Sequence, residues 1–263
     1  MVYQLLRRIS QIIPPSTRTI ITKPFRLIIN RYKHKNYFKT YQQYIHHSDL
    51  VFDVGAHHGV MTEFFLKCGA KVIAIEPEPD ALAILHKKFD GNPNVTIIPF
   101  GVASKPGELK LHVPINQKTA SSFSSQWHQR SHLSKFDIVT KDIEVITLDI
   151  LIEKYGIPSF TKIDVEGFEL EVLNGCNSIL PALSLEFTKE SLPLIHECLH
   201  KLELRGQYYF QYNTNPTYKL SKEKFTSGVE LEKALKQHCN KYYGYGDLFA
   251  TIIQPSTDEQ SLI

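Results

Sequence analysis

The chain has 263 residues, of which 42% are hydrophobic and 22% are charged. This composition excludes an intrinsically disordered chain, and the length is enough to bury the core of one α/β domain. No stretch approaches 18 consecutive apolar residues, so we expect no membrane-spanning helix. The four cysteines are scattered without metal-ligand spacing, which favours reduced thiols in a cytoplasmic protein.

Charge is distributed unevenly along the chain. Residues 1–48 carry nine Lys or Arg and no Asp or Glu, whereas the remainder carries 21 basic and 27 acidic residues. Apolar residues recur at helical spacing in this segment, and a Pro-Pro pair divides it. We therefore expect residues 1–47 to form a basic helical arm that packs its apolar faces on the domain. The alternative is that the arm lies on the anionic inner face of a membrane or on a polyanion.

The most informative stretch of the chain is LVFDVGAHHGVMTEFFLKCGAKVIAIE. The apolar run of residues 50–54 predicts a buried parallel strand, residues 58–67 predict a helix, and residues 71–75 predict a second strand. Gly55 and Gly59 bracket the turn between strand and helix, where glycine lets a ligand approach the backbone closely. This order of elements predicts half of a nucleotide-cofactor site.

Acidic residues in this stretch indicate which cofactor would bind. Glu76 lies 21 residues beyond Gly55, where dinucleotide-type folds use a carboxylate to accept hydrogen bonds from ribose hydroxyls. The turn reads Asp53-x-Gly-x-His57-x-Gly59 and lacks the Gly-x-Gly-x-x-Gly pattern, which argues against NAD. An acidic residue at the head of the loop suits S-adenosylmethionine, which carries a sulfonium and an ammonium group. The alternative is an ordinary strand–helix–strand unit that binds no ligand.

The rest of the sequence alternates between strand and helix patterns. Expected strands cover residues 95–102, 107–114, 143–146, 182–188, 207–212 and 248–253, and residues 160–167 are expected to form a further parallel strand and its exit. Expected helices cover residues 80–89, 147–155, 168–173, 190–204 and 229–238. We expect residues 107–114 to pair with residues 143–146, and residues 256–263 to form a frayed tail.

A polar stretch, residues 115–137, separates two of the expected strands and contains TASSFSSQWHQRSH. Long loops in compact domains are usually functional or disordered. We interpret this one as a lid or substrate loop in which Ser121 and Ser122 contact the substrate; a solvated insertion is the alternative. His112, His128 and His132 are further candidate contacts, although a single histidine is more often polar surface.

Two carboxylates, Asp164 and Glu166, follow the strand that begins at residue 160. Open α/β sheets bind their ligands beyond the carboxyl ends of the strands. We expect these carboxylates to provide a general base for a hydroxyl acceptor. They could instead hold a divalent cation, or one of them could cap the following helix. Lys162, within the strand, is expected to extend its ammonium group into solvent.

Several motifs together carry a family resemblance. DVGAHHG, IEPEPDAL, TASSFSS, ITLDIL and KIDVEGFELEVLNG resemble, in order and separation, the FkbM-type family of S-adenosylmethionine-dependent methyltransferases. The resemblance is strong over about residues 48–190 and weaker beyond. It implies a class I methyltransferase fold over residues 48–255: a Rossmann-like α/β domain with a seven-stranded, mostly parallel sheet, helices on both faces and an antiparallel last strand. His57 stands where the family usually has Asn.

The resemblance also implies a function, which is methyl transfer from S-adenosylmethionine, commonly to a hydroxyl of a sugar or secondary metabolite. Site residues carried over from the family are Asp53, Gly55, His57 and Gly59 around the methionine end, Glu76 on the ribose, and Pro77, Gly101 and Val102 beside the adenine. An NAD oxidoreductase and a noncatalytic module that binds a membrane or polyanion are the alternative functions. Nucleic acid is not an expected partner, because the basic residues are concentrated in the arm.

Overall fold

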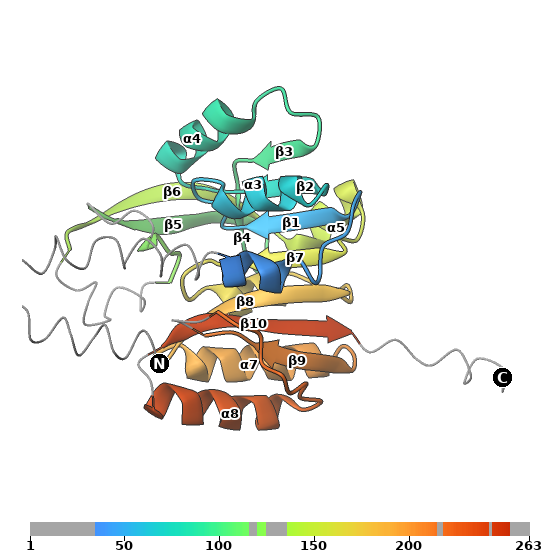
Figure 1. The fold of residues 1–263 in the computed structure, drawn as a ribbon. Coiled ribbons are helices and arrows are strands. Elements are labelled where there is room, and N and C mark those ends of the chain that lie inside the picture. Colours follow the sequence, from blue (N-terminus) through green and yellow to red (C-terminus); the bar gives the residue numbers. More distant parts are fainter. Residues whose placement is uncertain (1–34, 116–119, 125–135, 215–217, 242–243, 253–263) are drawn as a thin grey trace, which may run out of the picture.

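The computed structural model describes residues 35–115, 120–124, 136–214, 218–241 and 244–252. Figure 1 shows a central sheet with helices on both of its faces. Seven strands form this sheet in the order β3-β2-β1-β7-β8-β10-β9. Their bounds are β1 Leu50–Val54, β2 Lys71–Ile75, β3 Val95–Ile98, β7 Phe160–Ile163, β8 Ala182–Thr188, β9 Tyr208–Tyr212 and β10 Tyr245–Ile252.

Strand directions match the expected class. β1, β2, β3, β7 and β8 pair in parallel, whereas β10 is antiparallel to both β8 and β9. The mostly parallel sheet with an antiparallel last strand is therefore confirmed. The crossovers between parallel strands place helices on the two faces, as parallel sheets require.

Each face of the sheet has its own apolar core because side chains alternate along a strand. In β1, Val51 belongs to one core and Phe52 to the other. The first core includes residues of α3 (Val60–Lys67) and α4 (Pro79–Phe89). The second includes residues of α5 (Leu148–Tyr155), α6 (Glu169–Asn174), α7 (Leu192–Glu203) and α8 (Gly228–Lys241). Both faces are thus buried, which leaves the ends of the strands as the place for a ligand.

The expected strand over residues 95–102 is wrong in its extent. β3 ends at Ile98, and Gly101–Val102 form a separate strand, β4, in a second sheet. Pro99 has no backbone N–H group to donate to a ladder, so the chain leaves the main sheet there. The second sheet has the order β4-β6-β5, with β5 at Gly107–Pro114 and β6 at Ile138–Ile146. The expected pairing of residues 107–114 with 143–146 is confirmed and extends to residue 138.

Most of the predicted arm lies outside the described residues, as do its apolar positions before residue 34. The part that is described, residues 35–47, begins with a helix over 35–41. Tyr41 and Ile45 are buried, and the Tyr41 ring contacts the rings of Phe160 and Phe249 on the sheet. None of the described helices is long and apolar enough to cross a membrane.

Candidate active site

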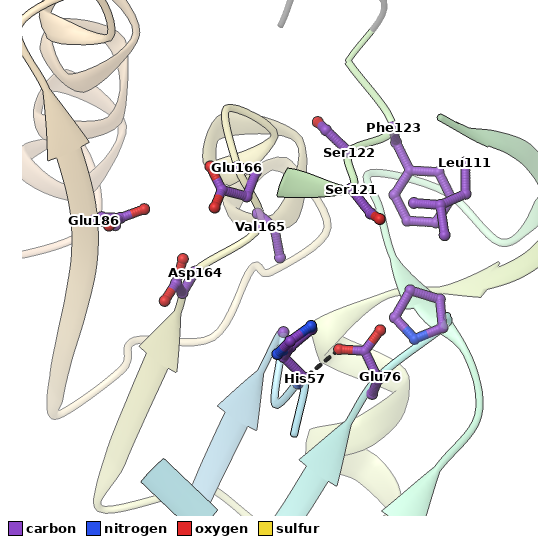
Figure 2. Close-up of a pocket in the computed structure, with 12 residues that line it drawn as sticks. His57, Glu76, Leu111, Ser121, Ser122, Phe123, Asp164, Val165, Glu166 and Glu186 are labelled. Carbon is purple, nitrogen blue, oxygen red and sulfur yellow. Dashed lines mark hydrogen bonds between the residues drawn. The ribbon is translucent and has the colours of Figure 1, made fainter. Parts of the chain in front are cut away.

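A cavity of about 240 Å³ lies beyond the carboxyl ends of β1, β2, β7 and β8. It is lined by Gly55, His57, Glu76, Pro77, Leu111, Ser121, Ser122, Phe123, Asp164, Val165, Glu166 and Glu186. Figure 2 shows the acidic side chains of Asp164, Glu166 and Glu186 on one side, Leu111 and Phe123 on the other, and His57 with Glu76 near the strand ends. Parallel sheets bind ligands at this edge because the strand-to-helix turns converge there.

The turn after β1 packs backbone to backbone against the turn after β7. Gly55 has a φ of +82°, and a Cβ atom there would lie 1.9 Å from the backbone oxygen of Asp164. His57 also has a positive φ, 46°, which directs its backbone N–H group toward Glu76. Burial, followed by the neighbouring His58, lowers the pKa of His57, so its ring is neutral at pH 7.

Glu76 stands at the end of β2 with only 6% of its surface exposed. Its Oε2 accepts a hydrogen bond from the backbone N–H of His57 at 2.7 Å, and its Oε1 accepts one from Glu78 at 2.8 Å. Burial raises the pKa of this carboxyl to about 7, although the two N–H groups oppose the shift. Two backbone donors fix the orientation of the side chain, and each oxygen keeps a lone pair for a ligand hydroxyl.

Three carboxylates form the acidic wall of the cavity. Asp164 follows β7, Glu166 lies in the next turn with a φ of +54°, and Glu186 projects from β8. One oxygen from each lies within 4.8 Å of the other two, a spacing at which a cation could be held. Burial raises the pKa of Glu186 well above its ordinary value, and the Asp164 and Glu166 charges raise it further.

Lys162 is not solvated, and that expectation is wrong. It is only 3% exposed, and its Nζ donates to Asp164 Oδ2 at 2.5 Å. The strand β7 runs through the middle of the sheet, so a side chain on either face meets protein rather than water. Glu169, rather than Asp164 or Glu166, makes the hydrogen bonds at the start of α6: its Oε1 accepts from the backbone N–H groups of Val165 and Gly167.

The opposite wall comes from the serine-rich segment. Ser122 forms a bridge with His112 of β5, and Ser121 and Phe123 beside it line the cavity. A Cβ atom on Gly101 would lie 2.5 Å from the Phe123 ring, so the absence of a side chain at Gly101 lets the ring pack against the backbone there. Residues 120–124, one described part of the predicted lid, therefore reach the cavity. His128 and His132 lie outside the described residues.

The cavity brings together most of the predicted site residues, namely Gly55, His57, Glu76, Pro77, Ser121, Ser122, Asp164 and Glu166. The remaining four, Asp53, Gly59, Gly101 and Val102, are absent from its described lining. Asp53 is buried and accepts a hydrogen bond from Thr62 of α3 at 2.6 Å. Gly59 packs under α4, where a Cβ would lie 2.5 Å from the Phe89 ring. Their roles toward a cofactor stay predictions.

Sequence reasoning did not place four lining residues in the site: Leu111, Phe123, Val165 and Glu186. Glu186 could have been predicted from the sequence, because an acidic residue near the end of a buried strand is unusual. Its strand, β8, is next to β7. Phe123 lies in the TASSFSS segment, next to the predicted Ser121 and Ser122. Leu111 carried no signal, since only the folding of β5 over the strand ends brings it there.

The strand order, the antiparallel β10 and a cavity at the carboxyl ends of β1, β2 and β7 match the class I methyltransferase fold. A family model described as the methyltransferase FkbM domain matches residues 53–216, well over half of the chain. The chain therefore belongs to the FkbM methyltransferase family, as the motifs predict, and its methyl donor is S-adenosylmethionine.

One curated relative is the hexuronic acid methyltransferase AglP of Haloferax volcanii. It is 30% identical to this chain over 141 residues, which are 52% of this chain and 53% of that protein. The match thus spans about half the length of the relative.

Solved structures with similar folds are distant. A precorrin-6y C5,15-methyltransferase from Geobacter metallireducens GS-15 is 10% identical, with a TM-score of 0.44 over 81% of this chain and 84% of that chain. An rRNA methylase from Streptococcus thermophilus is 12% identical, with a TM-score of 0.42 over 82% and 94%. Likenesses this distant carry no weight for the function.

The residues of the cavity fit S-adenosylmethionine. The fixed Glu76 carboxylate suits ribose hydroxyls, and the Gly55 turn exposes backbone beside it. The acidic wall around Asp164 suits the positive sulfonium and ammonium of the donor.

Proposed function

We propose that this methyltransferase acts on a hydroxyl group of a glycan or of a small metabolite. The observation that carries the proposal is the wall of three carboxylates, Asp164, Glu166 and Glu186, beside the expected position of the methyl group. A hydroxyl acceptor loses a proton during the reaction, and a carboxylate can accept it. The hexuronic acid named for the relative AglP supports a sugar as the acceptor.

The chain has two tasks in such a reaction. When bound, S-adenosylmethionine supplies an electrophilic methyl carbon on a positively charged sulfur. The protein has to align the acceptor oxygen with that carbon and exclude water. The sulfur of the donor would keep the electron pair of its bond to the transferred methyl group, so its positive charge is neutralised. The hydroxyl proton passes to a carboxylate oxygen of the wall, which keeps the charges balanced.

Asp164 and Glu166 are the predicted bases, and the structure adds Glu186. Asp164 already accepts from the Lys162 ammonium, which weakens it as a proton acceptor. Burial raises the pKa of Glu186 well above its ordinary value, which strengthens it as a base once it is ionised. Glu186 therefore joins the two predicted residues as a candidate.

The test uses the full chain, S-adenosylmethionine and the methyl glycosides of glucose, galactose and glucuronic acid. Formation of S-adenosylhomocysteine and of an O-methylated sugar is followed by mass spectrometry. We expect turnover on at least one sugar and a loss of about 100-fold in one of Asp164→Asn, Glu166→Gln or Glu186→Gln, the lower end of general-base effects. Glu108→Gln, an exposed glutamate on β5, is the matched control. Methylation of a nitrogen or carbon acceptor alone would contradict the proposal.

Turnover is expected to persist after treatment with EDTA. A divalent cation between Asp164, Glu166 and Glu186 would lie close to the Lys162 ammonium, which occupies Asp164 and repels positive charge. Loss of turnover with EDTA that added Mg²⁺ or Mn²⁺ restores would instead assign the three carboxylates to a metal.

A further inference from the structure

Lys162 lies at the centre of the sheet, directly behind the acidic wall. It is on β7, where its register neighbours are Asp53 on β1 and Ser184 on β8. The side chain is 4% exposed, and its Nζ is 2.5 Å from Asp164 Oδ2. A buried ammonium is costly unless it is paired, so this ion pair has to be present in the folded chain.

The surroundings of Lys162 are strongly acidic. Burial by itself would lower the pKa of the ammonium, but Asp164 and Asp53, followed by Asp247, raise it. Burial raises the pKa values of Asp53, Glu186 and Asp247, and the Lys162 charge opposes that rise. One buried cation thus interacts electrostatically with carboxylates that come from four strands or their ends.

Hydroxyl groups that face this cluster come from the helix over residues 35–41, from β8 and from α3. Tyr41 is fully buried, and its hydroxyl lies 3.2 Å from Ser184 Oγ. Asp247 has its own partner in Asn213, whose Nδ2 donates to Asp247 Oδ2 at 3.1 Å. Asp53 likewise accepts from Thr62. Asp164 differs from these two, because its side chain accepts from Lys162 and also reaches the cavity.

Asp164 is among the described residues that line the cavity, whereas Lys162 is not. Any effect of the ammonium on a ligand therefore has to pass through Asp164 or through the field of the cluster. Without the ammonium, the Asp164 carboxylate would lose its hydrogen bond and face Glu166 and Glu186 with like charge.

We propose that Lys162 is a positioning residue: its ammonium fixes the Asp164 carboxylate at the cavity wall, toward the bound cofactor and acceptor. The proposal rests on the proposed function only where an acceptor is involved, since binding of the methyl donor can be measured without an acceptor. In a purely structural role, Lys162 would stabilise the fold, and its loss would not change how Asp164 contributes to binding or turnover.

A double-mutant cycle separates these two roles. Lys162→Met and Asp164→Asn are made singly and together in the full chain. Calorimetry gives the Kd of S-adenosylmethionine and of S-adenosylhomocysteine, and the sugar assay gives kcat and KM. Thermal unfolding is recorded for each variant. Lys110→Met with Asp142→Asn, an exposed pair at 2.7 Å, is the matched control.

We expect Lys162→Met to weaken cofactor binding or to lower kcat by roughly tenfold when Asp164 is present, and by less than about twofold in the Asp164→Asn background. Lys162→Arg keeps the charge and is expected to restore part of the loss. The control pair should change neither quantity, because exposed ion pairs contribute little.

Equal losses in both backgrounds, or no loss from Lys162→Met in binding or turnover, would overturn the proposal. If Lys162→Met does not fold, the cycle is run with Lys162→Arg, for which a smaller loss is expected, because the charge is kept while the geometry of the ammonium contact is not. The binding measurement needs no acceptor, so a failure to find a sugar substrate would count against the proposed function and leave this test intact.

Discussion

Glu76 shows how one side chain can make cofactor binding depend on pH. Both of its oxygens accept backbone N–H groups, and burial raises its pKa to about 7. Only the ionised carboxylate can accept hydrogen bonds from two ribose hydroxyls, because the protonated form turns one oxygen into a donor. Below the pKa the group is mostly protonated, so the site loses an acceptor as the pH falls.

We therefore expect the affinity for S-adenosylhomocysteine to rise roughly tenfold from pH 6 to pH 8, following the ionised fraction of a group with a pKa near 7. Isothermal titration calorimetry at each pH measures it. Glu76→Gln keeps the shape but does not ionise, so its affinity should be lower at pH 8 and nearly flat with pH. A wild-type affinity that is flat from pH 6 to pH 8 would show that Glu76 is ionised throughout.

Glu76 was predictable from the sequence, whereas the state of Lys162 was not. The distance from Gly55 to Glu76 is set by one strand–helix–strand unit, so local pattern is enough to place the carboxylate. The burial of Lys162 depends on β1 and β8 flanking β7, and on a helix that precedes the domain motifs. Such long-range packing leaves no periodic signal in a four-residue strand.

At the scale of elements, the site depends on the contact between the turns after β1 and β7. Gly55 and Gly91 have the same φ, +82°, but differ in their surroundings. A Cβ on Gly55 would lie 1.9 Å from the Asp164 backbone oxygen, while a Cβ on Gly91 would meet nothing within 4 Å. Comparing substitutions at Gly55 and Gly91 therefore distinguishes the cost of backbone strain from the cost of steric overlap.

Gly91→Ala should lower the free energy of unfolding by about 1–2 kcal/mol, the cost of a left-handed conformation for a residue with a Cβ. Gly55→Ala should cost about 3–5 kcal/mol, because overlap with the Asp164 backbone adds to that strain. Urea denaturation measures both. If the two variants lose the same free energy of unfolding, the turns after β1 and β7 can move apart to make room for the added Cβ atom. Gly55→Ala should also weaken S-adenosylhomocysteine binding, whereas Gly91→Ala should not.

The strand predicted over residues 95–102 illustrates where element boundaries fail. Apolar residues continue through Phe100 to Val102, so the pattern shows one strand. The break comes from Pro99, and the released residues Gly101 and Val102 pair with β6, more than 40 residues later in the chain. The position of a proline marks such a break. The strand with which the following residues pair cannot be read from the local sequence, because it lies far away along the chain.

For the whole molecule, the uneven charge leads to a prediction about surfaces. Residues 1–48 carry nine basic and no acidic residues, and each basic residue near an anionic membrane contributes about 1 kcal/mol to binding. We expect the full chain to sediment with vesicles that contain phosphatidylserine at low salt, and to be released at about 1 M NaCl, where charges are screened within a few ångströms. Vesicles of phosphatidylcholine alone are the control. No sedimentation with anionic vesicles at low salt would remove the membrane as a partner of the arm.

β10 comes after every other described strand in the chain, yet it lies between β8 and β9 in the sheet. Until it is synthesised, β8 has one unpaired edge next to the cofactor site, and β9 lacks the neighbour that joins it to the main sheet of the described chain. During translation the first half of the sheet can assemble early, because β1, β2 and β3 are close in sequence, but closure waits for a distant segment. A ribosome-bound chain that lacks β10 therefore presents an open strand edge, which is the kind of surface that chaperones protect and aggregation exploits.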